Sequence, residues 1–137
     1  MSDCLFCKII NGEIPSEKVY EDADVFAFLD IHPVNPGHVL VVPKKHVADA
    51  VASDDATLGA VMSAARKLSA AVMRATGASG FNMEINNGVS AGQVVFHLHL
   101  HIVPRFINDG LKHWPGKEYA SGEAAAVAHK IKTALSA

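Results

Sequence analysis

Hydrophobic and polar positions follow different periods along the chain, and each period predicts an element. Between Asp55 and Thr76, apolar residues recur every three or four positions, as on one face of a helix, and Gly77 is a suitable stop signal. The apolar face consists of Leu58, Val61, Met62, Ala65, Leu68, Val72 and Met73. Two shorter helices are expected, one over residues 5–11 and one over residues 122–135.

Short apolar segments bounded by Gly, Pro or Asp predict β-strands. The expected strands cover residues 19–21, 25–29, 38–42, 81–86 and 94–103. Pro104 is expected to end the last strand. Successive strands around one long helix predict an α+β fold, a five-stranded antiparallel sheet packed with a long central helix and a C-terminal helix. Because no repeat or linker interrupts the pattern, residues 1–137 are expected to form a single domain.

Composition narrows the possible functions. The formal net charge is −2 and no basic stripe is visible, which argues against nucleic acid as a partner. No apolar stretch approaches the roughly 20 residues of a membrane span, and the N-terminus lacks the pattern of a secretory signal. Cys4 and Cys7 are too close in sequence to staple a fold, so we expect reduced thiols or metal ligands in a cytoplasmic protein.

Three histidines alternate with apolar residues at positions 97, 99 and 101. On a strand, this period of two places the three imidazoles on one face, with neighbouring Cα atoms about 6.5–7 Å apart. The apolar residues of the opposite face are Phe96, Leu98, Leu100 and Ile102, which we expect to pack on the core.

The alternating histidines allow three interpretations. They can be tolerated on an exposed strand face, although three in strict alternation make this a poor explanation. They can also bind a catalytic metal ion, but the outer pair would lie about 13 Å apart, which nearly exhausts the reach of two side chains to one ion. The third interpretation is nucleophilic catalysis by a neutral imidazole, which the pattern favours.

The segment from His97 to Val103 matches the motif His-φ-His-φ-His-φ-φ, where φ is apolar, and thereby resembles the histidine-triad family. The resemblance covers nearly the whole chain. It includes the segments Phe6–Ile10, Phe28–Asp30, Gly37–His38, Pro43–His46, Asn86 and Gly92–Gln93. It implies that His99 attacks the α-phosphorus of a nucleotide derivative and forms a covalent nucleotidyl-histidine, which water hydrolyses. His101 would contact the phosphate, and His97 and His38 would fix the imidazole geometry.

The same resemblance implies a purine nucleotide ligand, similar to AMP, and no organic cofactor. Asp30 would accept hydrogen bonds from the ribose, and Gly92 would allow the backbone close to the phosphate, beside the Gln93 amide. The apolar walls around the base would come from Phe6, Ile9, Phe28 and Ile31, and Asn86 lies in the segment expected to bind phosphate. Each wall residue could equally be ordinary core, and Asn87-Gly88 alone would be read as a turn.

A structural zinc site is a second expectation. Cys4-x-x-Cys7 has the spacing of half such a site, but a tetrahedral site needs two more ligands. Some bacterial-type members of the family complete it with the histidine after Pro-Lys-Lys and the first triad histidine, which are His46 and His97 here. The alternative is two ordinary thiols with His46 on the surface.

Three departures from the family pattern affect the expected substrate. Val94 stands where many relatives have Ser or Thr, Pro104-Arg105 replaces the glycines of the phosphoramidase branch, and the spacer before Trp114 is longer. The leading expectation is hydrolysis of purine nucleoside 5′-phosphoramidates or related AMP derivatives. The alternatives are a diadenosine polyphosphate hydrolase and a non-catalytic, zinc-containing nucleotide-binding protein. Family members imply a homodimer, in which Trp114 could approach the partner's site.

Overall fold

A computed structural model describes residues 3–137 of the chain. In this part of the chain the elements follow the order α1 (Leu5–Ile10), β1 (Lys18–Glu21), β2 (Val25–Leu29), β3 (Val39–Pro43), α2 (Asp55–Thr76), β4 (Gly80–Glu84), the 3₁₀ turn η1 (Val89–Ala91), β5 (Leu100–Arg105) and α3 (Glu123–Leu135). The described residues form a five-stranded sheet in the order β1-β2-β3-β5-β4, in which all neighbours are antiparallel. The predicted α+β fold class is therefore confirmed.

The long helix α2 has the bounds that its sequence predicts. Asp54 caps its N-terminus by accepting a hydrogen bond of 2.8 Å from the Thr57 amide, and Gly77 ends it in the left-handed conformation with φ of 73°. Its buried face packs on one side of the sheet, against β2, β3 and β5. Met62 lies outside this face and is about half exposed, whereas Ala64 is buried.

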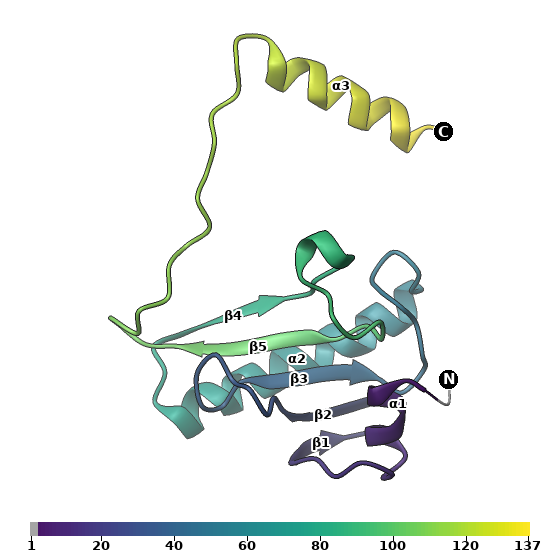
Figure 1. The fold of residues 1–137 in the computed structure, drawn as a ribbon, viewed down its shortest axis with the longest axis vertical. Helices are drawn as coiled ribbons and strands as arrows, with labels where there is room; N and C mark the ends of the chain where they lie inside the picture. Colours follow the sequence, from purple (N-terminus) through teal and green to yellow (C-terminus); the bar gives the residue numbers. More distant parts are fainter. Residues whose placement is uncertain (1–2) are drawn as a thin grey trace.

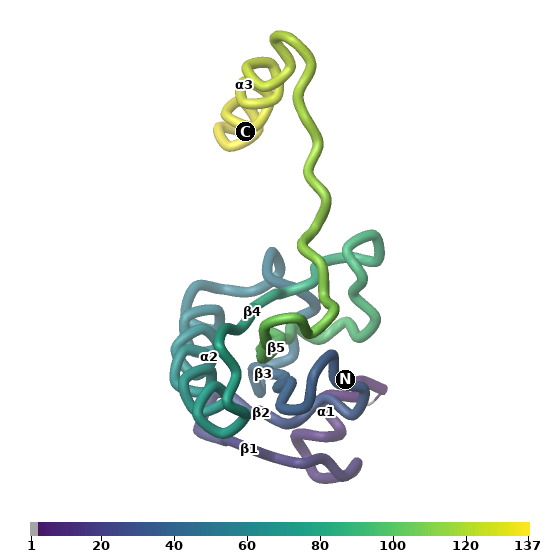
Figure 2. Tube along the Cα trace, turned by 90° about the vertical axis from the view of Figure 1, so that its left-hand side faces the viewer, coloured from purple at the N-terminus to yellow at the C-terminus, as the bar shows by residue number. Residues whose placement is uncertain are grey.

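The two faces of the sheet are covered differently, as Figure 2 shows, with α2 on one side and α1 on the other. On the side of α1, Phe6 and Ile9 join Phe26, Phe28, Leu40 and Val42 in a second apolar cluster. The pairing of Leu40 with His101 in the β3–β5 ladder places this histidine on the same face as that cluster. The site therefore lies on the face opposite the long helix.

The segment before β5 differs from the prediction. A strand was expected over residues 94–103, but β5 runs from Leu100 to Arg105 and includes Pro104, which was expected to end it. His97 and His99 therefore precede the strand. The amide of Leu98 donates instead to the carbonyl of Val47, in the loop after β3, at 2.7 Å. Phe96, which was expected to pack on the core, is 47 % exposed, while Leu98, Leu100 and Ile102 are buried.

The C-terminal part leaves the body of the molecule. Beyond β5 the chain runs outward as an extended arm and ends in α3, which stands apart from the sheet in Figure 1. Every residue of α3 is at least partly exposed, and the apolar side chains of Ile131 and Leu135 face solvent. Among residues 3–137, a helix of the length and hydrophobicity needed to cross a membrane is absent.

Candidate active site

The ring of His99 is held in one orientation. Its Nδ1 lies 2.7 Å from the carbonyl oxygen of His97, which can only accept, so Nδ1 carries the proton and Nε2 has the free lone pair. The ring of Phe6 meets it edge-to-face, with centroids 5.0 Å apart. Burial lowers the pKa of His99, which keeps the ring neutral near pH 7. A neutral imidazole with a directed lone pair is the form that attacks an electrophile.

His38 and His101 form a hydrogen-bonded relay beside this ring. The amide of Val34 donates to Nδ1 of His38 at 3.1 Å, so the His38 proton is on Nε2. Nε2 of His38 lies 2.9 Å from Nδ1 of His101 and donates to it. His101 therefore carries its own proton on Nε2, a buried atom without a hydrogen-bond partner among residues 3–137. An unpartnered buried donor calls for an acceptor.

Electrostatics keeps this relay neutral. Burial lowers the pKa of His101 to about 4, helped by the neighbouring His99 and His38. Burial also lowers the pKa of His38, against the opposing influence of Asp30, whose Oδ2 lies 3.7 Å from His38 Nε2. His38, His99 and His101 therefore offer N–H donors and lone pairs rather than positive charges.

A cavity of about 460 Å³ opens beside these histidines. Its wall includes most of the residues predicted to bind the nucleotide: Phe6, Ile9, Phe28, Asp30, Ile31, Asn86, Gly92, His99 and His101. Sequence reasoning did not single out Leu5, Ile14, Pro15, Ser16, Leu29, His32, Leu40 and Val95, which also line it. Val94 is on the wall too, and its side chain is 85 % exposed.

Gln93 and His38 are placed differently from the rest. The Gln93 side chain accepts from the Gly88 amide at 2.8 Å and donates to the Ala48 carbonyl at 2.7 Å, so it braces the loop behind the cavity. It does not belong to the lining residues of that cavity. His38 is also behind the wall and is 3 % exposed; its Nε2 contacts two lining residues of the cavity, His101 at 2.9 Å and Asp30 at 3.7 Å.

The four predicted metal ligands converge although they are distant in sequence. Cys4 Sγ and Cys7 Sγ lie 3.4 and 3.6 Å from His97 Nδ1, Cys7 Sγ lies 3.5 Å from His46 Nδ1, and the two Nδ1 atoms are 3.2 Å apart. Bond lengths of about 2.0–2.3 Å to a tetrahedral zinc ion imply edges of about 3.3–3.8 Å between its ligand atoms. Nε2 of His97 donates to the Pro43 carbonyl at 2.8 Å, which leaves its Nδ1 as a lone pair directed at the thiols. The donor set fits zinc.

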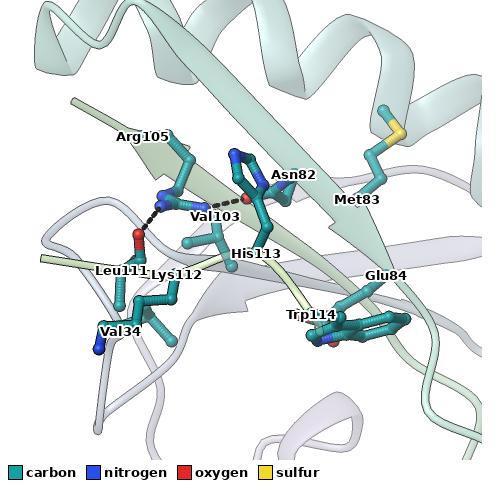
Figure 3. A pocket seen from close by; sticks show the side chains of 10 residues that line it. All are labelled: Val34, Asn82, Met83, Glu84, Val103, Arg105, Leu111, Lys112, His113 and Trp114. Atoms are coloured by element: carbon teal, nitrogen blue, oxygen red, sulfur yellow. Dashed lines mark hydrogen bonds between the residues drawn. The ribbon is translucent and has the colours of Figure 1, made fainter. Parts of the chain in front are cut away.

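Trp114 lies outside the nucleotide cavity of its own chain. It lines a second cavity, of about 470 Å³, between the arm and strands β4 and β5, together with His113, Glu84 and Arg105 (Figure 3). Its side chain is 86 % exposed. Within one chain, Trp114 therefore does not line the cavity that His99 and His101 line.

Comparison with known proteins agrees with this geometry. The family model of the HIT domain matches residues 11–108. "Adenylylsulfatase HINT3" of Arabidopsis thaliana is 44% identical over 110 residues, covering 80% of this chain and 56% of the relative. "Adenosine 5′-monophosphoramidase hnt1" of Schizosaccharomyces pombe is 39% identical over 119 residues, covering 87% of this chain and 80% of the relative.

Solved structures show that the likeness extends to the fold. A zinc-bound histidine-triad protein from Mycobacterium smegmatis matches with a TM-score of 0.78 and 33% identity, covering 96% of this chain and 98% of its own. A Streptococcus mutans protein matches with a TM-score of 0.93 and 43% identity, covering 98% of this chain and 87% of its own. The family match and the arrangement of the three histidines lead to one conclusion: this chain belongs to the HIT, or histidine-triad, family.

Proposed function

We propose that the chain hydrolyses purine nucleoside 5′-phosphoramidates or related AMP derivatives through a nucleotidyl-histidine. The observation that carries the proposal is the free Nε2 lone pair of His99, on a ring whose other nitrogen is fixed by a backbone carbonyl, on the wall of a cavity large enough for a nucleotide. The names of the relatives from A. thaliana and S. pombe, an adenylylsulfatase and an adenosine 5′-monophosphoramidase, describe activity on AMP derivatives, which supports this substrate class.

The proposed reaction has two steps. His99 Nε2 attacks the α-phosphorus, a P–N bond to His99 forms, and the bond to the leaving amine breaks as the amine takes up a proton from solvent. Water then attacks the same phosphorus, the P–N bond to His99 breaks, and AMP and neutral His99 are released while water returns a proton to solvent. The Nε2 proton of His101 would donate to a non-bridging phosphate oxygen, because this buried donor has no partner among residues 3–137.

A diadenosine polyphosphate is the second candidate substrate, suggested by Pro104-Arg105. Arg105 is not free to bind extra phosphates in this structure, because its Nε donates to Asp109 at 2.9 Å and its side chain also contacts Asn82 and Leu111. This favours the smaller leaving group of a phosphoramidate.

Incubation with adenosine phosphoramidate tests the nucleophile. We expect wild-type turnover, an adenylylated species by intact-mass analysis, and loss of several orders of magnitude in rate for His99→Ala, because one member of a cooperating catalytic set is removed. His129→Ala, which removes an exposed histidine of α3, is the control. Equal rates for His99→Ala and wild type would exclude His99 as nucleophile. Tight nucleotide binding without turnover would favour the non-catalytic alternative.

We also propose that Cys4, Cys7, His46 and His97 hold a structural zinc ion. Burial raises the pKa of the Cys7 thiol, so a thiolate there requires a nearby cation. Zinc would supply folding energy by joining α1, the loop after β3 and the segment before β5. The backbone carbonyl of His97 accepts the hydrogen bond from His99 Nδ1. Because zinc would fix the side chain of the same residue, the ion would also support the orientation of the nucleophile.

Metal analysis tests the zinc ligands directly. The purified protein should contain about one zinc per chain, and the double variant Cys4→Ser, Cys7→Ser should lose it, because two of four ligands are removed. The same variant should unfold at a lower temperature. Undiminished zinc in the variant would mean that other residues bind it.

Finally, we propose that the protein is a homodimer. The support is the exposure of large apolar side chains on the arm and on α3, including Trp114 and Leu135, which are 86 % and 81 % exposed in one chain. A cytoplasmic location stays a prediction from the sequence.

A further inference from the structure

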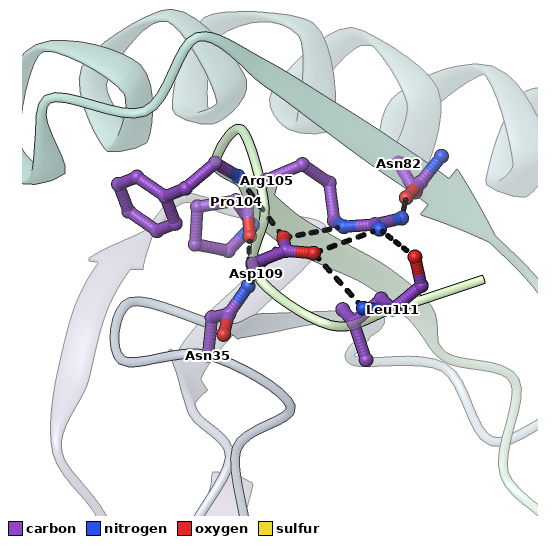
Figure 4. Close-up of polar contacts among 7 residues, drawn as sticks. Asn35, Asn82, Pro104, Arg105, Asp109 and Leu111 are labelled. Atoms are coloured by element: carbon purple, nitrogen blue, oxygen red, sulfur yellow. Dashed lines mark hydrogen bonds and ion pairs between the residues drawn. The ribbon is translucent and has the colours of Figure 1, made fainter.

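A polar network outside the catalytic centre surrounds Asp109, just beyond β5 (Figure 4). Its carboxylate accepts hydrogen bonds from Arg105 Nε at 2.9 Å, from the amides of Phe106 and Leu111 at 3.0 Å each, and from Asn35 Nδ2 at 3.2 Å. The Asp109 side chain is 8 % exposed, and its contacts with Arg105 hold its pKa below the usual range. Such a carboxylate is a fixed acceptor.

Asn35 connects this network to the loop between β2 and β3. Its side-chain amide donates to the Pro104 carbonyl at 2.8 Å as well as to Asp109, so both of its N–H groups point at acceptors 69 or more positions away in sequence. The backbone carbonyl of Asn35 accepts a hydrogen bond from the His38 amide at 3.1 Å. One residue thus ties the loop to the end of the strand that carries His101.

The neighbour of Asn35 in this loop is Val34, whose amide donates to Nδ1 of His38. That hydrogen bond determines which nitrogen of His38 is protonated, and the His38 proton in turn determines which nitrogen of His101 accepts. We propose that Asn35 is a positioning residue: anchored on Asp109 and the Pro104 carbonyl, it holds the Val34 amide on His38 and so keeps the proton of His101 on Nε2, in a ring that lines the cavity.

The effect of Asn35 on catalysis rests on the proposed function, because it acts through the N–H that His101 would donate to the phosphate. If the loop shifts, His38 can carry its proton on either nitrogen. A His38 proton on Nδ1 leaves Nε2 as an acceptor facing His101 Nδ1, which then takes the proton itself. The proton of His101 would leave Nε2, and the N–H that we propose as a donor to the phosphate would be lost. The network therefore acts at a distance, without contact with the substrate.

Two variants of Asn35 and one control test the role. Asn35→Ala removes both donors, and Asn35→Asp keeps the size but places a second carboxylate beside Asp109. Asn82→Ala is the matched control, because Asn82 accepts from the other end of the same guanidinium, at 2.7 Å, and among residues 3–137 it has no hydrogen bond to Val34 or Asn35. The readouts are the ring-nitrogen NMR shifts of His38, which distinguish the two tautomers, and single-turnover adenylylation by adenosine phosphoramidate.

We expect wild type and Asn82→Ala to show His38 protonated on Nε2, and both Asn35 variants to show a mixture of tautomers. The adenylylation rate of the Asn35 variants at saturating substrate should fall about tenfold to a hundredfold, the size of effect that misplaced groups produce, while the substrate concentration that gives half the maximal rate changes little. A pure Nε2–H tautomer in both Asn35 variants, or an equal rate loss in Asn82→Ala, would overturn the proposal. So would a wild-type His38 protonated on Nδ1, a test that needs no variant to fold. Absence of turnover in wild type would refute the proposed function alone, since the tautomer readout does not depend on it.

Discussion

Asp30 is positioned at the cavity wall so that its two carboxylate oxygens have different partners. Oδ1 accepts from the His32 amide at 2.8 Å, whereas Oδ2 lies 3.7 Å from His38 and is too far for a full hydrogen bond. Its side chain is 21 % exposed, so Oδ2 has capacity for an additional donor. The ribose role that the family resemblance implies for Asp30 fits this geometry.

Asp30→Asn should weaken use of ribonucleotides selectively. A hydroxyl bonded to a carboxylate contributes about 1.5–3 kcal/mol, so kcat/KM for adenosine phosphoramidate should fall roughly tenfold to a hundredfold. The 2′,3′-dideoxy analogue lacks those hydroxyls and should lose much less. Steady-state kinetics with the two substrates on the two proteins form a double-mutant cycle. Equal losses with both substrates would argue against a ribose contact.

At the scale of elements, the entry into β3 depends on Gly37. Its φ is +100°, in the region that favours glycine, and an added Cβ would lie 2.6 Å from the Cγ2 methyl of Thr76 at the end of α2. The glycine thus allows the loop before His38 to pass close to the long helix.

Gly37→Ala should lower the free energy of unfolding by about 1–3 kcal/mol, through backbone strain and the clash with Thr76. Gly37→Ala combined with Thr76→Ser should recover part of the loss, because Ser lacks the methyl but keeps the hydroxyl that bonds the Val72 carbonyl at 2.7 Å. Urea denaturation of the two single variants, the double variant and wild type separates the free-energy cost of backbone strain at residue 37 from that of the clash with the Thr76 methyl. A double variant no more stable than Gly37→Ala would show that the clash contributes nothing.

The elements with local signals were predictable from sequence. The bounds of α2 follow from its apolar period between Asp55 and Thr76 and from the terminal Gly77. The start of β5 was not predictable, because the apolar residues 94–96 and the alternation that begins at Phe96 look like a strand, while the Leu98 amide bonds to the loop after β3. That choice depends on tertiary pairing rather than on local pattern.

The candidate site shows the same division. Alternation of the histidines indicated their shared face, but the ligand set of Cys4, Cys7, His46 and His97 came from family resemblance, since spacing supplies only the cysteine pair. The link from Asn35 to Asp109 spans 74 positions and involves residue types common in turns, so no sequence signal identifies it.

At the scale of the whole molecule, the arm and α3 leave apolar surface that one chain does not cover. We expect the full chain to elute as a dimer at micromolar concentration in gel filtration with light scattering. Removal of residues 117–137 should weaken the dimer while leaving the Asp109 network and the core intact, because α3 buries none of its residues against its own chain. A monomeric full chain would refute the dimer.

The helix α1 contributes to two sites although it has only six residues. Cys4 and Cys7 point to the proposed zinc ion, and Phe6, between them, packs against the ring of His99 and lines the nucleotide cavity. Where two ligands hold the same helix, each changes the other's affinity by the same factor. The proposed zinc and nucleotide would therefore be linked thermodynamically: a nucleotide that binds the zinc-loaded form more tightly would retain the metal, and a chelator would then weaken substrate binding without occupying the nucleotide cavity.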